Sequence, residues 1–283
     1  MTSFPRRAPG GAHVRLCIAC ILLLGLTAPA AAQQRQAQVP STAERMTGAA
    51  ESSAWDGFEG NIGGGVILRP EYEGGSDFEA APLPWVDVTW RNRVFLHTEN
   101  GLGLNLRRTR NVQVAATLNV DLGRQEDDSD DLRGLGDIDE SLEVGGLFEL
   151  VNGHWRVHGS AALGVTDGHE GVIADLGFKY GARYGQRSVV TLGPTMTVAS
   201  DQYMQSYFGV DAQQSARSGL PQHEATLGIK DFTLEGQFTH YVTPNWAVSA
   251  KGEAVMLFGD AADSPIVQED MYFTAALVLT YGF

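Results

Sequence analysis

The last segment of the chain, residues 271–283, places an apolar side chain at every second position. Because successive side chains of a strand point to opposite faces, this period of two predicts a strand with one apolar face. Similar segments of about ten to fourteen residues, broken by Gly, Asn, Asp and Pro, recur from Gly57 onward. The chain ends on Phe283, which is typical of the assembly signature of outer-membrane barrels, although other sheet proteins also end in aromatic strands. The apolar positions of the final segment are Met271, Phe273, Ala275, Leu277, Leu279, Tyr281 and Phe283.

Alternation alone fits two architectures. A soluble sandwich turns its apolar face inward, whereas a membrane barrel turns it toward lipid. Three features favour the barrel: the segments exceed the length of most soluble strands, aromatic residues gather near their ends, and short connections alternate with long ones. We therefore expect an all-β transmembrane antiparallel barrel of about twelve strands, within roughly ten to fourteen. The expected interfacial aromatic residues are Trp85, Trp90, Phe95, Trp155, Tyr180, Tyr184, Tyr241 and Trp246.

The N-terminal segment has the composition of a secretory signal. Arginines precede an apolar run that is too short to cross a bilayer as a helix. Small residues follow it, and they suggest that the signal is cleaved after Ala32. The Arg6-Arg7 pair also admits twin-arginine export. Cys20 lies inside the apolar core, so a lipid anchor is not expected. The expected division is a signal peptide at 1–32, a disordered periplasmic leader at 33–56 and a barrel at 57–283.

Charge and cysteine content narrow the classes of partner and site. Both cysteines, Cys17 and Cys20, fall within the expected signal, so the exported chain would have no disulfide and no cysteine metal site. The chain has 20 basic and 34 acidic residues, and removal of the three signal arginines leaves 17 against 34, a formal charge of −17. Such a surface repels phosphate, which excludes nucleic acid as a partner.

Several blocks of sequence span nearly the whole expected barrel, namely residues 63–66, 70–76, 82–84, 95, 101–103, 132–138, 203–210, 215–220 and 257–267. Together, and in this order, they resemble the MltA-interacting protein (MipA/OmpV) family of outer-membrane proteins. Gly75 departs from the tighter Tyr-Glu-Gly-Ser spacing of the family, and this difference concerns only the local turn.

The resemblance implies a function. It implies an outer-membrane scaffold that links a lytic murein transglycosylase to a penicillin-binding murein synthase in cell-wall growth. The alternative is a small-solute outer-membrane channel. We expect no enzymatic activity, no cofactor and a monomer embedded in outer-membrane lipid and lipopolysaccharide. The family offers no binding motif that transfers to this chain residue by residue.

Candidate chemistry is sparse, and no catalytic, cofactor or metal residue is predicted. His154 and His158 have helical metal spacing, but on a strand they would lie about 13 Å apart. The acidic run 126–131 lacks the spacing of a calcium loop, which favours a solvated external loop. No nucleophile elbow accompanies the other polar residues near expected loops, so a hydrolase is disfavoured. Those residues are His97, His169, His223 and Asp201.

The face opposite the apolar one carries charges of both signs. They predict either a salt-bridged filling of a narrow lumen, which we favour, or the lining of a water-filled path. The glycines at 63–65 fall in a strand and are expected to relieve crowding or bend the wall rather than to bind phosphate. The charged residues are Glu59, Arg69, Asp121, Glu143, Glu149, Arg156, Asp175, Lys179, Arg183, Lys251 and Glu253.

Overall fold

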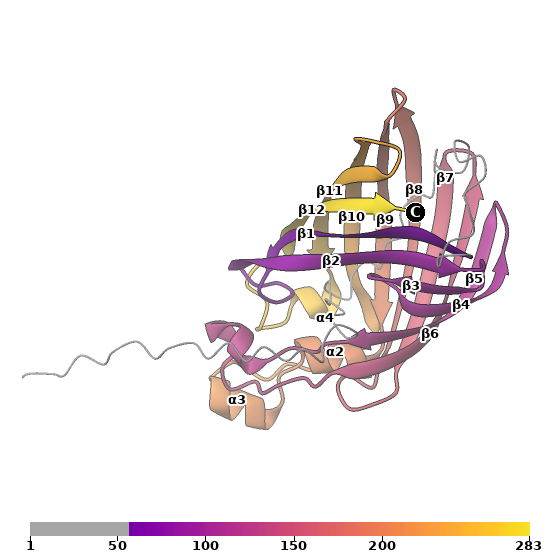
Figure 1. Cartoon of the computed structure of the whole chain (residues 1–283). Coiled ribbons are helices and arrows are strands. Elements are labelled where there is room, and N and C mark those ends of the chain that lie inside the picture. Colours follow the sequence, from indigo (N-terminus) through magenta and orange to yellow (C-terminus); the bar gives the residue numbers. More distant parts are fainter. Residues whose placement is uncertain (1–56) are drawn as a thin grey trace, which may run out of the picture.

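The strands form a closed antiparallel barrel in the computed structural model, which describes residues 57–283 (Figure 1). Within that range, twelve strands follow one another around the barrel in chain order, so the predicted fold class and strand number are confirmed. The expected signal peptide and leader lie outside the described residues. The strands are β1 (Phe58–Pro70), β2 (Phe78–Trp90), β3 (Val94–His97), β4 (Gly101–Arg108), β5 (Val112–Asp121), β6 (Ser141–Asn152), β7 (Trp155–Gly164), β8 (Val172–Tyr184), β9 (Ser188–Ala199), β10 (Gly228–Tyr241), β11 (Trp246–Leu257) and β12 (Met271–Gly282).

The apolar face of the strands points outward. In β12, Phe273 and Leu277 are 56% and 58% exposed, whereas the alternate residues Tyr272 and Val278 are buried. A soluble sandwich would show the opposite pattern, because its apolar face forms the core. The exposed apolar band therefore identifies the barrel as one that meets lipid.

The connections at the two ends of the barrel differ in length. At one end, which we call the turn end, tight turns such as 185–187 join the strands, and both β1 and β12 reach this end. At the other, which we call the loop end, long connections carry short helices (Figure 1). Within residues 57–283, no helix is long and apolar enough to cross a membrane. The helices are η1 (Glu126–Asp128), η2 (Asp130–Leu132), α2 (Asp201–Phe208), α3 (Ala212–Ser218) and α4 (Gly259–Ala262).

The wall is short at β3 and β4, where the expected strand length does not hold. β3 has four residues and β4 has eight, and the turn between them places Glu99 against Lys251 of β11. The expectation that Phe95 belongs to the interfacial aromatic residues is wrong. Its ring is 2% exposed and packs in the lumen with Ala115 and Leu147.

The seam between β1 and β12 closes the barrel and requires glycine. The strands pair from Asn61 opposite Gly282 to Leu68 opposite Ala275. A Cβ on Gly65 would lie 2.0 Å from the backbone oxygen of Leu277, a distance that real side chains do not tolerate. Of the three glycines expected to relieve crowding or bend the wall, Gly63 and Gly65 thus relieve crowding at the seam, whereas Gly64 has room for a Cβ.

We predict that Gly65→Ala weakens this closure, because the added methyl group collides with the backbone of β12. The free energy of unfolding should fall by about 1–3 kcal/mol, the usual cost of overpacking. Heat modifiability on gels and urea unfolding of the folded barrel provide the measurement. Gly64→Ala is the matched control, since its Cβ would meet nothing nearer than the Leu83 oxygen at 3.7 Å. Equal stability of the two variants would contradict the seam argument.

Candidate functional site

All three lysines of the chain face the barrel interior. Lys230 and Lys179 are 0% and 2% exposed, and the side chain of Lys251 is 18% exposed. An isolated ammonium group in such a site would cost several kcal/mol. Each lysine therefore requires carboxylates, and the strands and inward turns supply them.

The central network joins Lys179 and Lys251 through shared carboxylates. The Nζ atom of Lys179 lies 2.6 Å from Oε1 of Glu235, and the Nζ atom of Lys251 lies 3.4 Å from Oε2 of the same residue. Lys251 also contacts Glu99 at 2.8 Å and Glu253 at 3.1 Å. These residues come from β8, β10, β11 and the turn after β3, so the network crosses the lumen and supports the predicted salt-bridged filling.

A second ion pair depends on a β-bulge. The register between β9 and β10 shifts between Ile229 and Asp231, so Lys230 is the extra residue of a bulge. The bulge turns its side chain inward beside that of Asp231. The Nζ atom of Lys230 lies 3.0 Å from Asp231 and 2.9 Å from Glu73 of the loop between β1 and β2. The pair thus fastens that loop to the barrel wall. Strict alternation would have placed Lys230 on the lipid face, so the sequence analysis did not identify it.

Apolar packing fills the loop end of the barrel. Tyr203, Met204 and Phe208 of α2 are at most 1% exposed and pack against strand residues such as Val255 and Tyr272. α4 joins the same cluster. Since burial of one large apolar side chain contributes about 1.5–3 kcal/mol, this cluster holds the long connections against the inside of the barrel.

A polar pocket of about 100 Å³ remains at the loop end. The hydroxyl groups of Tyr203 and Tyr272 and the Nε atom of Arg124 are buried without a hydrogen-bond partner among the described residues. Burial raises the pKa of Tyr203 well above its usual range, so its hydroxyl keeps its proton. The pocket can therefore donate hydrogen bonds to a small polar molecule such as water. Its other lining residues include Arg69, Glu71, Tyr72, Glu73, Asp121, Asp128 and Tyr207.

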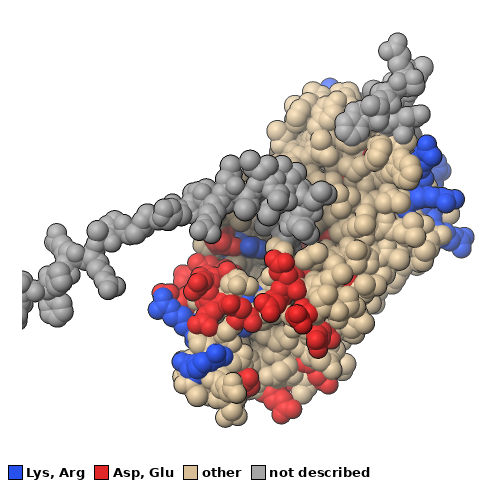
Figure 2. All heavy atoms as spheres, turned by 60° about the horizontal axis from the view of Figure 1, so that its bottom comes forward, with Lys and Arg blue, Asp and Glu red and all other residues tan. Residues whose placement is uncertain are grey.

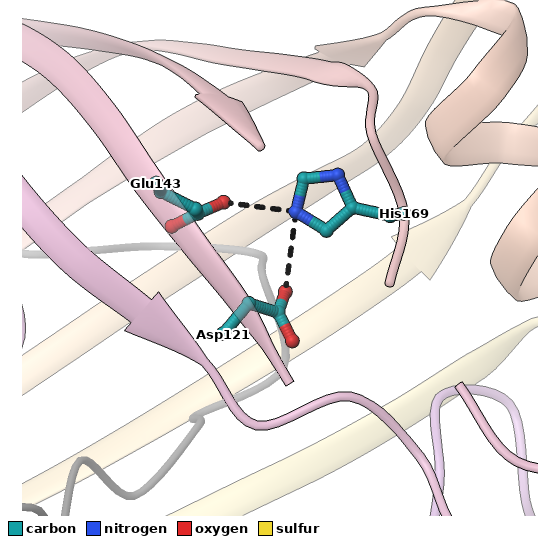
Figure 3. Close-up of side chains that lie close together, drawn as sticks. All are labelled: Asp121, Glu143 and His169. Carbon is teal, nitrogen blue, oxygen red and sulfur yellow. Dashed lines mark ion pairs between the residues drawn. The ribbon is translucent and has the colours of Figure 1, made fainter. Parts of the chain in front are cut away.

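Three residues beside this pocket form the tightest group of metal-ligand types among residues 57–283 (Figure 3). Asp121, Glu143 and His169 are all buried, and one ligand atom of each lies within 4.8 Å of the others. The Nε2 atom of His169 lies 3.3 Å from Glu143 and 3.9 Å from Asp121. Asp121 ends β5, Glu143 lies near the start of β6, and His169 comes from the loop after β7. Asp121 and Glu143 are among the expected lumen charges and His169 is among the expected loop residues, but no sequence pattern joins the three.

The hydrogen bond at Nδ1 of His169 disfavours a metal ion at Nε2 of the same ring. The backbone N–H of Gly171 donates to Nδ1 at 3.0 Å, so Nδ1 must carry a lone pair. A neutral imidazole then has its proton on Nε2, the atom that faces the two carboxylates. Metal coordination at Nε2 would move the proton to Nδ1, against the Gly171 N–H. The group is therefore a polar contact between wall and loop, in which the Nε2 atom of His169 lies 3.3 Å from Glu143.

The same group fastens α2. The hydroxyl of Tyr207 donates to Asp121 at 2.7 Å, and the guanidinium of Arg124 donates to the Tyr207 carbonyl at 2.9 Å. Burial, and next the charge of Asp121, raise the pKa of Tyr207, so this hydroxyl stays protonated and remains a donor. These hydrogen bonds therefore fix the orientation of α2, and the apolar cluster packs it against the inside of the barrel.

The remaining histidine and aspartate candidates lie apart from one another. His97 pairs with Asp87 in the lumen, His223 donates to the carbonyl of Asp260, and Asp201 accepts from the Leu227 N–H. Each is occupied by a local structural contact.

His154 and His158, which have helical metal spacing in the sequence, also have separate surroundings. His154 lies at the turn end and donates to the carbonyl of Gly181 at 2.9 Å, whereas His158 is buried in the lumen near Thr195. The two rings have separate partners.

The acidic run forms η1 and η2 at the loop end. The carboxylate of Glu126 accepts from the backbone N–H groups of Gly134 and Gly136, both at 2.9 Å. Asp128 accepts from the Gln125 N–H at 2.8 Å. Part of the acidic charge thus shapes the loop itself.

Two of the predicted lumen charges do not face the lumen. Glu59 and Arg183 are instead exposed at the turn end, where the strands leave the barrel interior.

Comparison with known protein families shows which family the chain belongs to. The sequence profile described as MltA-interacting protein MipA matches residues 62–283. The chain belongs to the MltA-interacting protein MipA family. It is therefore an outer-membrane β-barrel protein of that family, as the sequence resemblance implied.

Two curated MipA-family relatives match most of the chain. They are proteins named MltA-interacting protein from Escherichia coli strain K12 and Shigella flexneri. Each is 23% identical over 239 residues, which cover 84% of this chain and 94% of the relative. The match therefore includes nearly all of each relative.

Solved outer-membrane proteins show only a distant likeness to this MipA-family barrel. An outer membrane channel from Pseudomonas putida F1 is 10% identical with a TM-score of 0.38, covering 82% of this chain and all of that one. The outer membrane channel DcaP of Acinetobacter baumannii is 9% identical with a TM-score of 0.36, covering 83% of this chain and all of that one. Likeness of this degree carries no argument about function.

We predict that Glu235→Gln strongly destabilises the barrel, because it leaves buried lysines short of a counter-charge. The free energy of unfolding should fall by about 3–5 kcal/mol in urea titrations of the folded protein. The exposed Glu59→Gln is the control and should change it by less than about 0.5 kcal/mol. The double variant Lys179→Met with Glu235→Leu should recover much of the loss, since it removes both charges. An equally unstable double variant would mean that side-chain shape, not charge, matters at this place.

We also predict that Zn²⁺ and Mn²⁺ do not stabilise the protein through His169, since its Nε2 carries a proton. A ligand at one hundred times its Kd would add about 2.7 kcal/mol of stability. Unfolding midpoints with increasing metal, for the natural protein and His169→Gln, provide the measurement. A midpoint that rises only in the natural protein would establish a metal centre and refute the tautomer assigned above.

Proposed function

We propose that this protein is an outer-membrane scaffold that links a lytic murein transglycosylase to a murein synthase in cell-wall growth. The observation that carries the proposal is the family match over residues 62–283, together with relatives named for interaction with MltA. The synthase partner rests on the family resemblance. We further propose export through the signal peptide at 1–32, a periplasmic leader at 33–56 and a monomeric barrel at 57–283, in contact with outer-membrane lipid and lipopolysaccharide.

The interior of the barrel is compatible with a role that uses its ends rather than a pore. Lys179, Lys230 and Glu235 are nearly inaccessible to solvent, and the ion pair between Lys251 of β11 and Glu99 of the turn after β3 crosses the lumen. Such contacts weigh against the alternative function, a small-solute channel. The short-turn end of outer-membrane barrels faces the periplasm, where murein enzymes work, so we place partner binding there.

The scaffold can be tested by crosslinking its partners to the barrel, and the positions of the lysines decide which crosslinker can be used. The chain has three lysines, and all of them lie in the lumen, so amine-reactive crosslinkers would find no accessible lysine. The cysteines, Cys17 and Cys20, fall in the expected signal, which leaves the exported chain open to a single introduced thiol. Gln186 lies in the exposed turn between β8 and β9, and Gln213 is exposed in α3 at the opposite end.

We expect Gln186→Cys, loaded with a thiol-linked photocrosslinker in intact envelopes, to capture both a lytic transglycosylase and a murein synthase. Mass spectrometry of the adducts is the measurement. The matched variant Gln213→Cys should capture neither, because its thiol lies at the loop end. Absence of both enzymes at full barrel yield would reject the scaffold. Bilayer recordings with steady single-channel conductance would then establish the channel.

A further inference from the structure

The two ends of the barrel carry opposite charge. Figure 2 shows acidic side chains gathered over the loop end and a group of basic side chains at the far end. In a chain of formal charge −14, the turn end is thus a basic surface. We call it the arginine rim and define it as the exposed residues Arg91, Arg93, Arg107, Arg110, Arg183 and Arg187.

The rim lies in or beside three turns. Arg91 and Arg93 lie between β2 and β3, Arg107 and Arg110 lie at the turn between β4 and β5, and Arg183 and Arg187 flank the turn between β8 and β9. None of the ion pairs among residues 57–283 uses these six side chains. Their guanidinium groups therefore remain available for an anionic partner.

Arg91 occupies a backbone position that disfavours its residue type. Its φ is 47°, and that of the following Asn92 is 57°, in the left-handed region where Gly or Asn is usual. The guanidinium carbon lies 5.0 Å from the ring centre of Trp90, an outward-facing aromatic residue. The turn thus presents its arginine at the border of the apolar band.

The chemistry of the rim fits a partner that repeats planar carboxylates. A guanidinium binds a carboxylate through two parallel hydrogen bonds, which an ammonium group cannot do, and every exposed cation at this end is arginine. The rim is spread over separate turns rather than packed into one patch. Its turn tips, including Asn92, Thr109 and Gln186, are polar. An extended polyanion matches this arrangement better than one compact protein surface.

We propose that the arginine rim binds the carboxylates of murein peptide stems and holds the periplasmic end of the barrel against the cell wall. This proposal rests on the proposed function for the orientation of the barrel. It adds a direct contact with the polymer to the contacts with its enzymes. Several weak arginine contacts, each modest alone, would together give reversible attachment that salt weakens.

The test is sedimentation of the full exported protein with purified murein sacculi free of protein, in a neutral detergent. Arg93→Gln with Arg110→Gln is the rim variant, and Arg133→Gln with Arg217→Gln is the matched control at the loop end. We expect the rim variant to bind at least about threefold more weakly, since each exposed ion pair contributes modestly and two are removed. The control should bind as the natural protein does. Sacculi whose carboxylates have been converted to neutral amides should no longer retain the protein.

Three outcomes would overturn the proposal. They are unchanged binding of the rim variant, equal loss in the control, and retention by the amidated sacculi. Vesicles with phosphatidylglycerol form a further arm: rim-dependent binding to them, without binding to sacculi, would assign the rim to lipid phosphates. Because the sacculi contain no enzymes, this result is independent of the crosslinking experiment, and either proposal can fail while the other stands.

Discussion

The structure depends on the pairing of its first and last strands. In hydrocarbon no water can satisfy an unpaired backbone N–H or C=O, so a sheet that spans a bilayer must close on itself. β1 and β12 meet this requirement over eight paired positions, from Asn61 and Gly282 to Leu68 and Ala275. The glycines at 63 and 65 allow the two backbones to approach closely. Without that seam the remaining strands would end in two open edges.

Closure with the apolar face outward forces the polar face inward. Lys179 and Lys230 in the lumen are almost inaccessible to solvent. Shared counter-charges and inward loops supply their partners. Glu235 serves two lysines, and the bulge beside Asp231 adds a third lysine to the interior. Apolar residues of α2 close the loop end above them. The result is a barrel with an ion pair across its lumen and an apolar cluster at its loop end.

The two ends of the barrel have separate characters. The loop end is acidic and structured by its own carboxylates, as Glu126 shows by accepting two backbone hydrogen bonds. The turn end is short, polar at its tips and rich in arginine. Lysine, which is more strongly hydrated and binds carboxylates as a point charge, is confined to the interior. A barrel with this distribution gathers most of its exposed arginines at the turn end, away from the acidic loops.

Sequence alone determined the barrel, its strands and its family, because a period of two over long segments has few other solutions and the family blocks occur in order. It also separated short turns from long loops. Tertiary structure decided what no local pattern records. The bulge reversed the facing of Lys230, and register placed Phe95 opposite Thr89 on the lumen face. The turn after the short β3 brought Glu99 to Lys251, and three distant segments brought Asp121, Glu143 and His169 together. Alternation fixes which face a side chain takes, whereas its partner depends on register, bulges and loop entry. These arise only when the strands are closed into a ring.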